Sequence, residues 1–84
     1  MSDNSLSRSA SMHPADSAQH YFEQGNGLRD LGRIDDAITS FRQAITLRPE
    51  YAEALNNLGG ALCRRGEWEE GEARIRQAIS EALR

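Results

Sequence analysis

The chain has 84 residues, of which 38% are hydrophobic and 27% are charged, and 13 acidic against 10 basic residues give a net charge of −3. This length allows one small domain, and the composition is ordinary for a soluble helical protein. A mildly acidic chain without a basic stripe is not expected to bind nucleic acid, and no apolar run is long enough to span a membrane. The single cysteine, Cys63, indicates a reducing compartment, and we expect the protein to be cytoplasmic.

Residues 1–15 are predicted to form a disordered leader ahead of the folded part of the chain. Serine occurs five times in this segment before position 12, and large apolar side chains are nearly absent. Such a segment cannot bury enough apolar surface to offset the entropy lost on ordering. Order is expected to begin near Pro14, with Asp16 as the cap of the first helix and Gln19 three residues after it.

From Ala18 onward the chain repeats itself, so that Ala18 corresponds to Ala52. When residues 18–51 are aligned with residues 52–84, eight positions are identical. The longest identical run matches residues 42–45 with residues 76–79. A fixed period of this length indicates a stack of repeated structural units.

Each unit is predicted to contain two antiparallel helices. In the first unit, residues 21–31 place apolar and small side chains three and four positions apart, which is the spacing of one helix face. Gly32 is expected to end this helix, because glycine readily takes the left-handed conformation found at helix ends. A second apolar stripe covers residues 34–47 and stops before Pro49.

The second unit follows the same plan, with a first helix over residues 55–65 and a break at Gly66. Its second helix is predicted to begin near Trp68 and to run toward the end of the chain. The sequence therefore predicts an all-α fold of four helices, arranged as two helix-turn-helix units.

Small residues recur at the positions where paired helices are expected to touch. Gly25 and Gly59 occupy the same place in the two units and are expected to let the helices of each unit lie very close. Phe41 and Ile75, on the second helices, are expected to fill the remaining space at the packing density of a protein interior.

These positions together resemble the tetratricopeptide repeat (TPR), a helix-turn-helix unit with the same period as this chain. The first unit matches the family pattern at Tyr21, Gly25, Leu28, Gly32, Ala37, Phe41, Ala44 and Pro49, and the second at Leu55, Leu58, Gly59, Leu62, Gly66, Gly71, Ile75 and Ala78. The sequence departs from the pattern at Gln24, Gly71, Glu72 and Leu83. The resemblance implies a short right-handed solenoid over residues 16–84, with repeat 1 at about 18–51 and repeat 2 at about 52–84.

The resemblance also implies a concave groove, lined by the first helix of each unit, that holds an extended peptide or a partner helix. Asparagine suits such a groove, because its amide can donate to and accept from the backbone of a bound peptide. The groove residues expected on this basis are Phe22, Asn26, Arg29, Asn56, Asn57 and Arg64, flanked by Gln19, Glu23, Asp30, Glu53, Gly60 and Cys63.

Asn26 and Asn57 stand at positions similar to those of two asparagines in TPR domains that clamp a C-terminal carboxylate. Those clamps also use a lysine where Phe22 stands, and basic residues from a third repeat. The sequence therefore does not favour a carboxylate clamp. Two interpretations remain open, namely a general asparagine-lined groove and a pair of solvated polar side chains on helix surfaces.

No constellation of residues predicts catalysis, a metal site or a cofactor. His13, His20 and Cys63 lie at spacings that fit neither a nucleophile with its base nor a metal site. We therefore expect a protein-interaction module rather than an enzyme. The alternatives are the TPR segment of a larger enzyme, such as a TPR-bearing glycosyltransferase, and a purely structural assembly unit.

The last predicted helix carries apolar residues on the side where a further repeat would stack. Two repeats bury little surface, and solenoids usually need three or more with a polar cap. We expect either a longer array or self-association into a homo-oligomer, with an isologous contact closing a dimer. The expected self-association face consists of Trp68, Ile75, Ile79 and Leu83.

Overall fold

The computed structural model describes residues 14–84, and the segment predicted to be a leader lies largely outside this range. Within it the chain forms four α-helices and no strand: α2 (Pro14–Asp30), α3 (Ile34–Leu47), α4 (Ala52–Arg64) and α5 (Trp68–Ala82). Because α2 begins at Pro14, Asp16 lies within its first turn rather than ahead of it. Proline suits a first helical position, since the N–H that it lacks has no partner within the helix there.

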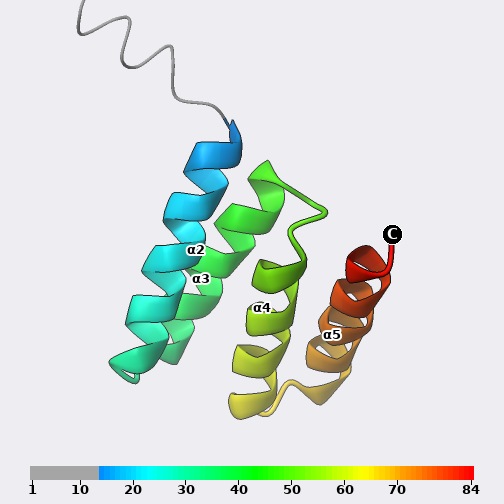
Figure 1. The fold of residues 1–84 in the computed structure, drawn as a ribbon. Helices are drawn as coiled ribbons and strands as arrows, with labels where there is room; N and C mark the ends of the chain where they lie inside the picture. Colours follow the sequence, from blue (N-terminus) through cyan, green and yellow to red (C-terminus); the bar gives the residue numbers. More distant parts are fainter. Residues whose placement is uncertain (1–13) are drawn as a thin grey trace, which may run out of the picture.

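The helices pack in the order in which they follow one another along the chain (Figure 1). The most extensive contacts join α2 to α3 and α4 to α5, while α3 and α4 join the two pairs. The predicted all-α fold of two helix-turn-helix units is therefore confirmed. None of the four described helices is long and apolar enough to cross a membrane.

Glycine ends the first helix of each unit, as the sequence predicts. Gly32 and Gly66 have φ angles of 81° and 91°, a conformation that side chains other than glycine rarely adopt. The N–H of Arg33 donates to the carbonyl of Leu28 over 2.9 Å, which ties the turn back onto α2. The corresponding bond of the second unit joins Glu67 to Leu62, so that each turn has the geometry of a Schellman motif.

The core lies between the helices of each pair and along the junction of α3 with α4. Phe41, Leu55, Leu58 and Leu62 are the largest fully buried side chains. Phe22 is partly buried and packs against both buried clusters, one around Phe41 and the other around Tyr51. The junction between the repeats is therefore a continuation of the core, and it fixes how α2 and α4 present their outer faces.

Candidate protein-binding surfaces

Two predicted groove residues, Asn26 on α2 and Asn57 on α4, meet directly. Nδ2 of Asn57 donates a hydrogen bond to Oδ1 of Asn26 over 2.7 Å, and both residues are half-buried. The stacking of α4 beside α2 brings them together although 31 positions separate them. Each amide keeps one group that bonds to no other described side chain, namely Nδ2 of Asn26 and Oδ1 of Asn57. This asparagine pair therefore offers a donor and an acceptor side by side.

The other polar residues of the predicted groove lie along the same two helices. Arg29 is half-buried and pairs with the neighbouring Asp30, with 3.3 Å between Nη2 and Oδ1. Asn56 and Arg64 are exposed on α4. The exposed flanking residues are Gln19, Glu23, Asp30, Glu53 and Gly60. We refer to this set, with the asparagine pair, as the α2/α4 surface.

Two residues expected in the groove instead take part in packing. The ring of Phe22 lies 5.1 Å from that of Tyr51 and 6.2 Å from that of Phe41, centroid to centroid. Cys63 is half-buried, and its Sγ is the atom nearest to where a Cβ on Gly71 would lie, at 2.6 Å. Both residues therefore help to fix the placement of α2, α4 and α5.

The predicted self-association face is largely exposed on α5. Trp68, Ile79 and Leu83 are 66%, 56% and 81% exposed. Ile75 differs, because it is half-buried and its Cγ1 would lie 2.5 Å from a Cβ on Gly59. Ile75 thus fills the space beside Gly59, as the sequence also predicts, and only the other three residues present large apolar groups to the outside.

A depression of about 250 Å³ lies between the start of α4 and the end of α5. It joins a residue of the predicted groove, Asn56, to one of the predicted self-association face, Ile79. Its lining consists of Ala52, Glu53, Asn56, Ala78, Ile79 and Ala82. This α4/α5 depression was not predicted, although the identity of Ala18, Ala44 and Ile45 with their counterparts in its lining was a signal for it.

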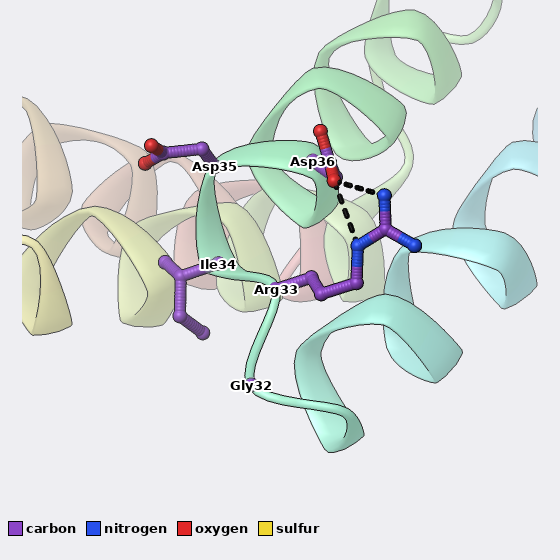
Figure 2. A pocket seen from close by; sticks show the side chains of 5 residues that line it. All are labelled: Gly32, Arg33, Ile34, Asp35 and Asp36. Atoms are coloured by element: carbon purple, nitrogen blue, oxygen red, sulfur yellow. Dashed lines mark hydrogen bonds and ion pairs between the residues drawn. The ribbon is translucent and has the colours of Figure 1, made fainter.

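A second kind of depression lies at the turn within each unit. Figure 2 shows the one between α2 and α3, of about 400 Å³, lined by residues 32–36. Arg33 pairs there with Asp36 at 2.7 Å, while Ile34 and Asp35 point away from that pair. Residues 66–70 form its counterpart between α4 and α5. Each is a shallow depression formed by the residues of one turn. Among residues 14–84 no group of His, Cys, Asp or Glu side chains could hold a metal ion.

One ion pair ties the second helices of the two units together. Arg42 of α3 donates to both carboxylate oxygens of Glu70 on α5, over 2.7 and 3.0 Å. These hydrogen bonds lower the pKa of the Glu70 carboxyl below its ordinary value and raise that of the Arg42 guanidinium. A further pair joins Arg65 to Asp35 at 2.9 Å. The relative orientation of the two units, and with it the asparagine pair, is held by these contacts as well as by the core.

Comparison with known proteins decides the family. A family model described as TPR repeat matches residues 25–66, and a second, described as Tetratricopeptide repeat, matches residues 52–82. The chain belongs to the TPR family. The two matches together span residues 25–82, from the second half of α2 to the end of α5, so the resemblance drawn from the sequence is confirmed.

The TPR units of this chain are also similar to part of a much longer enzyme. Over 59 residues, or 70% of the chain, it is 41% identical to Protein O-mannosyl-transferase TMTC1 of Homo sapiens. The protein of the same name from Mus musculus matches with the same identity over the same length. The chain spans 7% of the human protein and 6% of the mouse protein.

Proposed function

We propose that this chain is a protein-interaction module that binds a peptide or helix of another protein across the α2/α4 surface. The observation that carries the proposal is the asparagine pair. The free Nδ2 of Asn26 and Oδ1 of Asn57 match the carbonyl and N–H of a peptide group, and so can hold a peptide backbone whatever its side chains. Binding is the proposed role, and no residue of the chain is proposed to be catalytic.

Substitution of both asparagines tests this proposal. We expect Asn26→Ala with Asn57→Ala to weaken capture of partner proteins by about tenfold, the effect of losing two ordinary hydrogen bonds. The measurement is a pull-down with quantified partners, followed by titration of the strongest partner. Gln43→Ala, at an exposed position on α3, is the matched control. Unchanged binding by a double variant of normal helicity would contradict binding at the α2/α4 surface.

A second candidate role is that of a TPR segment within a larger glycosyltransferase. The similarity to a part of Protein O-mannosyl-transferase TMTC1 favours it. In such a protein the α2/α4 surface would bind substrate proteins or regulatory partners, while another domain carries out the transfer. Genomic sequence around the coding region is the test, because this role requires an open reading frame that extends beyond these 84 residues to include a catalytic domain.

We also propose that the chain associates with a second copy of itself through α5. The support is the exposure of Trp68, Ile79 and Leu83 along this helix. Large apolar side chains that gather on one surface commonly mark an interaction site. Sedimentation equilibrium over a wide range of protein concentration measures this directly, and a monomer at every concentration would contradict it.

A further inference from the structure

We infer that two copies pair through an antiparallel contact of their α5 helices, with Trp68 of each copy seated in the α4/α5 depression of the other. This inference rests on the self-association proposed above and adds to it the surface, the register and the two complementary groups. Three features of the described residues support it: an uncovered helix face, a depression of the right kind, and a charge pattern that is complementary to itself.

The uncovered face is revealed by comparing α5 with α3, its counterpart in the first unit. On α3, Ile34, Ile38, Phe41 and Ile45 form a stripe that packs against Leu58, Ala61 and Leu62 of α4. The counterparts on α5 are Trp68, Glu72, Ile75 and Ile79. No further described helix stacks on them, and Trp68 and Ile79 are more than half exposed. The face of α3 that packs against α4 therefore has a counterpart on α5 that no described helix covers.

The α4/α5 depression is the counterpart of a site that already holds an aromatic ring. In the first unit Tyr51, only 6% exposed, packs in a cluster with Ala18 and Ala44, against which Ile45 also lies. The corresponding residues, Ala52, Ala78 and Ile79, are identical and line the depression. The same small and branched side chains therefore leave room for a ring in the second unit.

The lining of the depression also supplies acceptors for the N–H of an indole ring. Gln19 and Phe22 of the first unit are replaced by Glu53 and Asn56 in the depression. Both replacements present oxygen acceptors, and Glu53 forms no ion pair with any described residue. A tryptophan ring buried here can donate its N–H to one of these oxygens, as buried indoles usually require. Trp68, the single tryptophan of the chain, is the exposed ring on the same helix pair.

The register follows from the charges. Four residues of α5 and the residue that follows it are spaced three or four positions apart and share one side: Trp68, Glu72, Arg76, Ile79 and Leu83. When two such helices run antiparallel with Trp68 opposite Ser80, beside Ile79, Glu72 falls opposite Arg76 of the second copy. The two-fold symmetry of the contact repeats both pairings. Glu72 and Arg76 are 69% and 78% exposed and pair with each other within one helix at 3.3 Å, so both can turn outward.

Head-to-tail stacking of copies fits the structure less well. In such a stack α2 of the next copy would take the place that α4 has on α3. The residues that meet α3 there are Tyr51, just before α4, and Ala54, Leu58, Ala61 and Leu62 of α4. Their counterparts in the first unit are Ser17, His20, Gln24, Gly27 and Leu28, of which only Leu28 is a large apolar residue. The surface of α2 is therefore less apolar than that of α4, which favours contact of α5 with a second copy of α5.

Charge reversal tests the antiparallel register in the intact 84-residue chain. Glu72→Arg places two arginines of one copy against two of the other, and Arg76→Glu does the same with glutamates. We expect each variant alone to raise the dissociation constant of the dimer at least about tenfold, as close like charges across an interface do. An equimolar mixture should return to within about threefold of the wild-type value, because the heterodimer again pairs opposite charges. Each single variant also loses its intrahelical pair, which mixing cannot restore, so recovery reports the contact between copies.

Trp68→Ala tests the aromatic insertion, with Leu31→Ala as the control. Leu31 is 74% exposed at the end of α2, outside the proposed contact. We expect Trp68→Ala to raise the dimer dissociation constant at least about tenfold, as truncation of a central tryptophan commonly does, and Leu31→Ala to leave it unchanged. The emission of Trp68 in the wild-type chain should shift to shorter wavelength as dimer forms, because the ring leaves water.

The outcomes separate this inference from the proposal beneath it. A wild-type chain that sediments as a monomer at every concentration overturns both. Two outcomes would support self-association but contradict the α5 pairing. One is a dimer that Trp68→Ala leaves intact, and the other is a pair of charge-reversed variants whose affinity does not recover on mixing. Loss on each single reversal, recovery on mixing and loss with Trp68→Ala together support it.

Discussion

The two TPR units share one backbone plan, but their helix pairs touch in different ways. In the first unit, the three atoms nearest to a Cβ on Gly25 would all belong to the ring of Phe41, with Cε1 at 2.5 Å. In the second, a Cβ on Gly59 would meet Cγ1 of Ile75 at 2.5 Å and also the backbone carbonyl oxygen of Gly71 at 2.7 Å. The helices α4 and α5 are therefore in backbone contact at this point, whereas a side chain separates α2 from α3.

This difference explains a departure from the family pattern. Gly71 replaces the alanine found at position 37 in the first unit, and glycine inside a helix lowers helix stability by roughly 0.5–1 kcal/mol relative to alanine. A Cβ on Gly71 would lie 2.9 Å from the carbonyl oxygen of Gly59 and 2.6 Å from Sγ of Cys63. The glycine thus permits the close approach of α4 and α5, and a residue that looks unfavourable within one helix is favourable between two.

The largest effect in this comparison is expected from Gly59→Ala. The new methyl group would displace backbone as well as Ile75, so we expect the free energy of unfolding to fall by about 2–3 kcal/mol, the upper part of the range for overpacking. The nearest neighbour of the methyl group in Gly25→Ala is the side chain of Phe41, and this variant should lower the free energy of unfolding by about 1–2 kcal/mol. Urea unfolding followed by circular dichroism measures both values.

Gly60→Ala is the control for these substitutions. Gly60 is exposed in the middle of α4, and a Cβ there would have no atom within 4 Å. We expect this substitution to raise the free energy of unfolding by about 0.5–1 kcal/mol, since alanine restricts the unfolded chain and favours the helix. Neighbouring glycines should therefore respond with opposite signs. A stabilising effect of Gly59→Ala would show that α4 and α5 are not in backbone contact.

Gly71→Ala is expected to be destabilising, but less so than Gly59→Ala. Overpacking of about 1–3 kcal/mol opposes a helix-propensity gain of about 0.5–1 kcal/mol, so we expect a net loss of about 1–2 kcal/mol. Cys63→Ala removes the nearest atom, and the two substitutions together should be less destabilising than the sum of each alone. Strict additivity in urea unfolding would contradict contact between Cys63 and Gly71.

The sequence was sufficient to predict the helices because their signals are local. The spacing of apolar residues, the glycines at positions 32 and 66 and Pro49 act within one or two turns, and the structure bears out the four helices and both glycine turns. The small residues at positions 25 and 59 also lie where helices touch.

The candidate surfaces were less predictable, because the direction of a half-buried side chain depends on the neighbouring helix. The sequence pattern assigns Phe22 and Cys63 to a helix face. It does not predict that Phe22 turns toward Tyr51 and Cys63 toward Gly71. The hydrogen bond between Asn26 and Asn57 depends in the same way on the distance between α2 and α4. Such contacts arise from the spacing of helices, on which the sequence pattern gives little information.

The acidic residues at the start of the second helices provide the last comparison. Asp36 and Glu70 are counterparts, but Asp36 pairs with the nearby Arg33 while Glu70 reaches back to Arg42 of the first unit. The Glu70 side chain is 34% exposed, so water screens the pair, and we expect Glu70→Gln to lower the free energy of unfolding by about 0.5–1 kcal/mol. Asp36→Asn, with both partners more than half exposed, should change it by less than about 0.5 kcal/mol.

The pH dependence of this effect has a definite sign. Because Arg42 lowers the pKa of Glu70 in the folded chain, folding favours the ionised carboxylate. The stability that Glu70 contributes is then fully present above its ordinary pKa of 4.5 and is lost as the pH falls through the lower folded value. The difference between wild type and Glu70→Gln, measured by urea unfolding between about pH 3 and 7, should therefore shrink toward the acid end. A difference that stays constant over this range would mean that the carboxylate is not held by Arg42.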